Sequence, residues 1–425
     1  MNKFIEIAGR IGAQRHLVAI RDGFVTIMPL MILGSMITLL NSLPIKAYQS
    51  FMAMIFGGEE WKGFGGAVWQ GTFAIVSLLI VFTVAYQLAR SYDKDGLSSG
   101  VVALASLITI MQTTSDGGIP LGWVGAQGLF IALIVALVST EIFTRLLGNK
   151  RLIVKMPDSV PPAVAKSFAA LYPAMITISL FGLIKILTVV GGMPDIHQAF
   201  YETLQGPVSK MANTLGSAVV VAVIVHVLWF FGLHGANIME PLMQAIYLPA
   251  IEANAAALAA GEEIPYIVTK SFFDAFMYLG GTGATMGLII AVFIAGRRHK
   301  HYRNVSQLSA TPGIFNINEP VLFGFPMVLN PVLIVPFILT PVILTVFSYI
   351  MIATGVVPKT VAFIPWTTPP IIGGFLATGS WKGAALAAFN LVVAIVAYLP
   401  FVKIAERMEL KKLKELEEAQ QKDVA

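Results

Sequence analysis

The chain has 425 residues, of which 56% are hydrophobic and only 12% are charged, and its formal net charge is +5. Soluble proteins carry about twice that charged fraction, so the composition excludes a water-soluble globular protein. The sequence contains no cysteine, which excludes disulfides, thiolate metal sites and a cysteine nucleophile. The apolar runs are about 20 residues long and continuous, which favours membrane-spanning helices over the shorter, alternating strands of a barrel.

The segment before the first apolar run, Met1 to Asp22, is too long and too charged for the basic region of a cleaved signal sequence. Its apolar residues, among them Phe4, Ile7 and Ile11, recur at roughly helical spacing. This pattern predicts an amphipathic helix on the inner membrane surface. The alternative is a solvated cytoplasmic segment.

Five apolar stretches of spanning length come next, near residues 23–42, 72–90, 98–114, 124–147 and 167–191. Lys and Arg lie before the first stretch, between the second and third, and between the fourth and fifth, whereas the loop at 115–123 has neither. Because basic loops are retained in the cytoplasm, this alternation predicts a cytoplasmic N-terminus. The charges follow membrane topology and do not form a nucleic-acid-binding surface.

The second half carries further stretches near residues 214–232, 275–296, 328–355 and 383–402, and a basic run at 297–303 that predicts a cytoplasmic loop. Polar residues or prolines interrupt it in three segments: FFGLHGANIMEPL, GIFNINEPVLFGFPMVLNP and IPWTTPPIIGG. Broken helices at membrane depth are tolerated where they are buried or line a wet cavity, and in transporters they mark binding sites. We therefore divide the chain into a scaffold and contact surface at 1–195, a substrate-handling half at 196–402, and a charged, helical cytoplasmic tail at 403–425.

Two ionisable side chains in the interrupted segments are candidates for chemistry. Glu319 lies between apolar flanks, and a carboxylate at membrane depth is costly and normally functional. His234 precedes Gly235, and its imidazole can hydrogen-bond a hydroxyl, stabilise an anion or shuttle a proton. The alternatives are a carboxylate satisfied by backbone amides at a helix start and a satisfied core histidine. Together the two side chains form a polar pair of the type that a hydroxyl-bearing ligand needs.

Three amide side chains accompany this pair: Asn237, Asn316 and Asn318. Amides both donate and accept hydrogen bonds, which suits sugar hydroxyls better than ions or lipids. Trp366, in the proline-broken segment, is a candidate platform for the apolar face of a pyranose ring. Its alternative role is that of a tryptophan at the membrane interface.

The glycine-rich run Gly280–Thr285 superficially suggests a phosphate cradle, but it lacks the lysine and the spacing of a P-loop. Small residues that let helices approach closely explain it with fewer assumptions. His299 and His301 are interpreted as part of a cytoplasmic charge cluster, and no other group has metal-ligand spacing of any strength. We therefore expect neither a metal nor a cofactor.

Two long segments carry a resemblance to a known family. WFFGLHGANIMEPL (229–242) and NINEPVLFGFPMVLNP (316–331), in that order, are similar to hallmark segments of enzyme IIC, the membrane permease subunit of the phosphoenolpyruvate-dependent sugar phosphotransferase system. The likeness is to its lactose/cellobiose/diacetylchitobiose family, and it extends to RDGFVTIMPLMILGS (21–35) and GGTGATMGL (280–288). It runs over essentially the whole chain.

The resemblance implies an all-α polytopic membrane protein with about ten transmembrane helices and two re-entrant hairpins, assembled as a homodimer in the lipid of a bacterial plasma (inner) membrane. The N-terminal half would supply most of the dimer contact and the C-terminal half would hold the sugar. Both termini are expected in the cytoplasm.

The resemblance also implies a substrate and a partner. A disaccharide of cellobiose or diacetylchitobiose type would be translocated, and its C6 hydroxyl would be phosphorylated by the phosphocysteine of enzyme IIB. Carried onto this sequence, Glu319 would bind that hydroxyl as general base, and His234 would hold the hydroxyl or the phosphoryl group. Asn237, Asn318 and Trp366 would contact the sugar.

Because the chain has no cysteine, it cannot be its own phosphocarrier, and we expect IIA and IIB as separate polypeptides. The main alternative is an ion-coupled secondary transporter, which would use Glu319 as a proton or cation site and move unmodified sugar without a partner. A second alternative is an intramembrane enzyme with His234 and Glu319 as acid and base in hydrolysis. Neither a nucleophile nor a metal-ligand pattern supports that alternative.

Overall fold

The computed structural model describes residues 13–42, 45–149, 160–193, 195–296, 300–325 and 332–424, together with residues 10, 151, 152, 154, 157 and 327. Every regular element in these ranges is helical, which confirms the all-α prediction. The chain folds into two compact units. We call Arg10–Met211 with Glu240–Glu252 the N-terminal unit, and Ala212–Met239 with Ala253–Ala425 the C-terminal unit.

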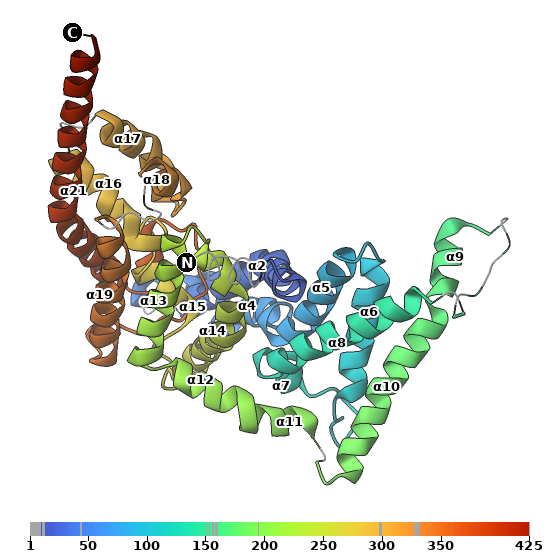
Figure 1. Cartoon of the computed structure of the whole chain (residues 1–425). Helices are drawn as coiled ribbons and strands as arrows, with labels where there is room; N and C mark the ends of the chain where they lie inside the picture. Colours follow the sequence, from blue (N-terminus) through green and yellow to red (C-terminus); the bar gives the residue numbers. More distant parts are fainter. Residues whose placement is uncertain are drawn as a thin grey trace. The chain divides into compact units, whose positions relative to one another are not determined.

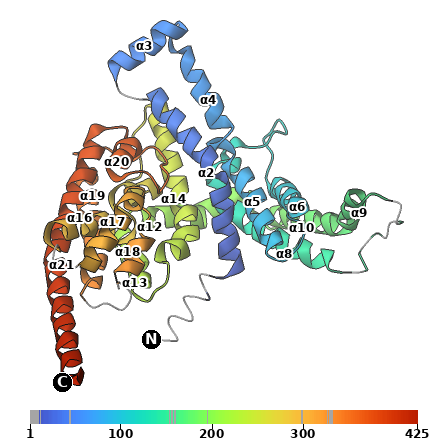
Figure 2. The same ribbon diagram turned by 90° about the horizontal axis from the view of Figure 1, so that it is seen from above.

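The N-terminal unit is a helical bundle built around one central helix. α5 contacts α2, α6 and α8 (Figure 1), and its inward face, including Ile80, Val84 and Leu88, is fully buried. α4 packs beside α2 (Figure 2). The helices of this unit, in chain order, are α2 (Arg15–Ser42), α3 (Lys46–Phe56), α4 (Lys62–Gln70), α5 (Val76–Arg90), α6 (Gly96–Ile110), α7 (Leu121–Val124), α8 (Leu129–Leu147), α9 (Pro162–Ala169), α10 (Leu171–Val190), α11 (Ile196–Phe200) and α12 (Gly206–Ala212).

The predicted amphipathic segment Met1–Asp22 overlaps the start of α2. Residues from Arg15 onward belong to one helix that continues through the first apolar stretch to Ser42. Residues 15–22 are therefore part of the first spanning helix and not of a separate surface helix. Most of the predicted amphipathic segment before Ala13 lies outside the described residues.

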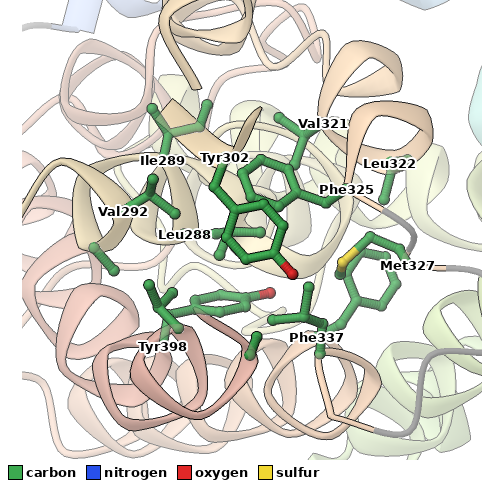
Figure 3. Close-up of a cluster of buried hydrophobic side chains, with 14 of the residues drawn as sticks. Leu288, Ile289, Val292, Tyr302, Val321, Leu322, Phe325, Met327, Phe337 and Tyr398 are labelled. Atoms are coloured by element: carbon green, nitrogen blue, oxygen red, sulfur yellow. The ribbon is translucent and has the colours of Figure 1, made fainter. Parts of the chain in front are cut away.

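The C-terminal unit packs its helices around a large apolar cluster that includes Tyr302, Phe325, Phe337 and Tyr398 (Figure 3). α16 contacts α21 along its length, and α19 and α20 also contact α21. Its helices are α13 (Leu215–Phe230), the ends of α14 (Gly235–Ala260), α15 (Lys270–Phe276), α16 (Thr285–Ala295), α17 (Lys300–Ile314), α18 (Glu319–Gly324), α19 (Ile334–Ala353), α20 (Pro370–Thr378) and α21 (Trp381–Val424).

The multi-pass membrane prediction is confirmed, whereas the count of ten spans stays a prediction. Among the described residues, six helices are long and apolar enough to cross a membrane. A seventh is added if Ile196–Ala212 and Leu215–Phe230 form one bent span, and α6 and α16 are shorter apolar helices. Every apolar stretch predicted from the sequence contains a helix. The tail is helical as predicted, because α21 continues without a break to Val424.

Candidate functional site

His234 lies at a break between two helices, and the break is built by local sequence. α13 ends where Gly232 adopts a left-handed conformation (φ 78°), with the Leu233 amide donating to the Leu228 carbonyl at 3.1 Å and the Gly232 amide to the Trp229 carbonyl at 2.9 Å. These two bonds form the Schellman motif that commonly ends helices at glycine. The chain then restarts as α14 one residue after His234.

The imidazole of His234 caps the new helix. Its Nδ1 accepts the backbone N–H of Asn237 at 3.2 Å, so Nδ1 carries no proton and the ring proton lies on Nε2. A Cβ at Gly235 would clash with the carbonyl oxygen of Val225, so glycine is required for α14 to begin this close to α13. The cap and the close packing therefore fix the direction in which Nε2 points.

Glu319 follows a second break with the same hydrogen-bond pattern. α17 ends where Asn316 takes the left-handed conformation (φ 60°), with the Ile317 amide donating to the Pro312 carbonyl at 3.1 Å and the Asn316 amide to the Gly313 carbonyl at 3.0 Å. Asparagine is the residue that most readily replaces glycine in that position. Glu319 is the first residue of α18, and Pro320 follows it in the first turn. Proline is tolerated there because the backbone N–H that it lacks would have no acceptor within the helix.

The structure brings the two predicted ionisable residues together. His234 Nε2 lies 3.6 Å from Glu319 Oε1, with 34% and 45% of the two side chains exposed. This distance is too long for a direct hydrogen bond between the two side chains. Because Nε2 carries the proton, the pair presents one donor and one acceptor to the same space. A hydroxyl placed between them could accept from the imidazole and donate to the carboxylate.

Asn316 and Asn318 are both buried, and their side-chain amides form hydrogen bonds with other groups of the protein. Asn316 Nδ2 donates to the carbonyls of Trp366 (2.6 Å) and Thr368 (2.9 Å), and its Oδ1 accepts the Gly280 amide at 2.8 Å. Asn318 Nδ2 donates to the carbonyl and the hydroxyl of Thr282 at 2.6 and 3.0 Å. These amides thus tie the Glu319 break to two other parts of the unit.

The glycine run serves this packing. Gly281 has φ 93°, and a Cβ there would lie 2.6 Å from Asn318 Cγ and 2.7 Å from the Asn316 carbonyl oxygen. Only a residue without a side chain allows the turn to lie directly against the Glu319 break. Close packing on small residues, rather than a phosphate cradle, therefore accounts for the run.

The remaining predicted residues lie at the surface of the unit. Asn237 is exposed, and its backbone amide is the group that His234 caps. Trp366 is 44% exposed, and its carbonyl is held by Asn316. Among the described residues, no group of three or more His, Asp or Glu side chains could hold a metal ion.

Two features of this unit were missed by the sequence analysis. The Trp229 ring lies 4.5 Å from the His234 ring and is 4% exposed, so it forms one wall beside the imidazole. Lys270 Nζ contacts both carboxylate oxygens of Asp274 at 2.8 and 2.9 Å, with both side chains buried. The sequence signal for this ion pair was its i, i+4 spacing within an aromatic run.

The chain is similar to known proteins over most of its length. Residues 21–341 match the family model described as "Phosphotransferase system, EIIC". The chain is 41% identical over 422 residues to the lichenan permease IIC component of Bacillus subtilis (strain 168), covering 96% of this chain and 93% of the relative. It is 39% identical over 429 residues to the cellobiose-specific EIIC component of Geobacillus stearothermophilus, covering 96% and 94%.

The fold matches a solved structure as well. The transporter ChbC, the IIC component of an N,N'-diacetylchitobiose-specific phosphotransferase system, superposes with a TM-score of 0.90 at 39% identity, covering 96% of this chain and 98% of ChbC. The family match includes both helix breaks that carry His234 and Glu319. This chain therefore belongs to the EIIC family of membrane permease components of the sugar phosphotransferase system.

Proposed function

We propose that this protein binds a β-linked disaccharide of cellobiose or diacetylchitobiose type and presents its C6 hydroxyl for phosphorylation by enzyme IIB. The observation that carries the proposal is the His234–Glu319 pair, in which an N–H donor and a carboxylate face each other at 3.6 Å. Relatives named for cellobiose and diacetylchitobiose support this substrate class.

The chemistry needs little beyond positioning. Glu319 accepts the proton of the C6 hydroxyl, a bond forms between that oxygen and phosphorus, and the phosphorus–sulfur bond to the cysteine of IIB breaks. The thiolate leaves with IIB, and the proton stays on Glu319 until it is released. His234 donates from Nε2 to the hydroxyl or to a phosphoryl oxygen, where negative charge gathers during transfer.

The amides divide into two roles in this proposal. Asn237, with its exposed side chain beside the cap, contacts the sugar, and the exposed Trp366 indole covers an apolar ring face. Asn316 and Asn318 act as positioning residues, since their amide hydrogens already bond to protein groups. Mutation of the two positioning residues should therefore disturb the site even before sugar is added.

The proposal extends to assembly and topology. The C-terminal unit holds the sugar, the N-terminal unit provides the homodimer contact, and both termini lie in the cytoplasm, where separate IIA and IIB subunits act. Basic residues in alternate loops support this orientation. Ion-coupled transport is less well supported, because the related proteins are named as components of phosphotransferase systems.

Binding of radiolabelled sugar to the purified protein, without any partner, tests the proposal. We compare cellobiose with diacetylchitobiose on wild type, Glu319→Gln and His234→Ala, with Glu263→Gln as a matched control at an exposed carboxylate in the same unit. We expect one disaccharide to bind wild type and the control, and to lose at least about tenfold in affinity on each site variant. Equal binding by all four proteins would refute the assignment of the pair as the sugar site.

A further inference from the structure

α17 and α18 form a helical hairpin, and a hydrogen bond joins the start of α17 to the end of α18. His301 Nε2, near the start of α17, donates to the carbonyl of Gly324, the last residue of α18, at 2.9 Å. A Cβ at Gly324 would lie 2.5 Å from Val305 Cγ1, so the two helices also approach closely there. We call the surface formed by Lys300, His301, Arg303, Phe323 and Gly324 the hairpin mouth.

The hairpin mouth lies one short helix away from the candidate catalytic carboxylate. Glu319 is the first residue of α18 and Gly324 the last. At 1.5 Å per residue, the two ends are separated by about 7.5 Å along the helix axis. The mouth is therefore an end of the hairpin from which a short protein loop could reach Glu319.

The mouth also lies beside the point where α21 leaves the apolar core. Tyr302 is buried in the same cluster as Val402 and Ala405, and a Cβ at Gly296 would lie 3.2 Å from Val402 Cγ1. After Ala405, α21 continues as the charged tail (Figure 1). The hairpin mouth therefore lies on the same side of the C-terminal unit as the tail. The proposed topology places this side in the cytoplasm.

The side chains of the mouth have the chemistry of a phosphoprotein-binding surface. Lys300, His301 and Arg303 are all exposed, and the preceding residues in the sequence, Arg297 and Arg298, are also basic. Phe323, the residue before Gly324, is 74% exposed. Cations suit the dianionic phosphoryl group, because charge-assisted hydrogen bonds to phosphate are the strong ones. Exposed aromatic residues and arginine are both enriched at protein interfaces.

We infer that the hairpin mouth is the docking surface for the phosphocysteine loop of enzyme IIB. This inference rests on the proposed function, since it names where the partner of that reaction binds. Lys300 and Arg303 attract and orient the phosphoryl group, Phe323 provides apolar contact, and the His301–Gly324 bond keeps the end of α18 in place for the approach. An anionic lipid headgroup would find the same charges, but it would gain nothing from their closeness to Glu319.

The test uses the full-length protein in nanodiscs with phosphorylated IIB. The variants are Lys300→Glu/Arg303→Glu and Phe323→Ala, and Lys382→Glu is the control at an exposed lysine in the first turn of α21. We expect the charge reversal to raise the KM for phosphorylated IIB by about tenfold or more and to weaken its salt dependence, because surface charges govern encounter rates. Partner-free sugar affinity should stay that of wild type, and the control should match wild type in both assays.

Distinct outcomes separate the two proposals. If wild type binds no sugar, the proposed function fails. If wild type binds and phosphorylates sugar but the charge-reversal and Phe323→Ala variants keep its KM for IIB, the docking surface is wrong. If the KM changes in discs with anionic lipid but not in neutral discs, the mouth binds lipid headgroups and the inference is overturned. Should the charge-reversal protein fail to fold, Lys300→Gln/Arg303→Gln is measured in its place, with a smaller rise in KM expected.

Discussion

Replacement of Asn316 tests whether the proposed sugar site is held in place by this one amide. Asn316→Ala removes hydrogen bonds to Trp366, Thr368 and Gly280, three backbone groups from distant parts of the chain. Each is worth about 1 kcal/mol net. Alanine in the left-handed conformation costs roughly 1 kcal/mol more. The expected destabilisation of the C-terminal unit is therefore about 4 kcal/mol, a large part of the stability of a typical domain.

Asn316→Gly separates the two contributions. Glycine accepts φ 60° without strain but makes none of the three bonds, so its cost should be about 3 kcal/mol. We expect the apparent thermal midpoint of the sugar-free protein to fall in the order wild type, Gly, Ala, and sugar affinity to fall with it.

The measurement is thermal unfolding in detergent without sugar, followed by sugar binding on the same preparations. The decisive quantity is the midpoint of the sugar-free protein, because a residue that only contacts sugar does not stabilise the empty site. If Asn316→Ala weakens sugar binding but leaves that midpoint unchanged, Asn316 touches the sugar directly and the positioning role is refuted.

Two further substitutions test other parts of the same unit. Asp274→Asn removes the carboxylate that pairs with the buried ammonium of Lys270, which should lower the free energy of unfolding by about 3–5 kcal/mol. Thermal unfolding should show a large fall in midpoint. A midpoint equal to that of wild type would contradict a structural role for the pair. Gly235→Ala forces α14 away from the Val225 carbonyl, so sugar affinity should fall about tenfold or more as the His234 cap shifts. Gly216→Ala, where the nearest atom is 3.9 Å away, is the matched control and should bind sugar like wild type.

Local sequence was enough to predict the long apolar helices and the segments in which they are interrupted. Long apolar stretches determine where a chain can cross a bilayer, and glycine or asparagine at a helix end determines where it can turn. Gly232 and Asn316 both provide such an end, and the two ionisable candidates follow directly after these breaks. The pairing of His234 with Glu319, expected from the sequence as a polar pair, is seen in the structure.

The role of the buried amides could not be predicted in the same way. Asn316 bonds to groups 36, 50 and 52 residues away, and no local pattern reveals which backbone groups folding brings beside an amide. An asparagine that binds sugar and one that binds backbone look alike in a sequence. The start of α2 was misjudged for a related reason, because amphipathic spacing describes a surface helix and the end of a spanning helix equally well.

The length of α21 has a mechanical consequence. It contains 44 residues, about 66 Å of helix, against a hydrocarbon thickness of about 30 Å, and Pro400 lies inside it without ending it. The Tyr398 hydroxyl donates to the Gly283 carbonyl at 2.6 Å, in the turn that packs against the Glu319 break. A force on the C-terminal part of α21 is thus transmitted along the helix to that turn. A bulky domain fused rigidly to the C-terminus would therefore shift the turn at Gly283, whereas a flexible linker would leave it in place.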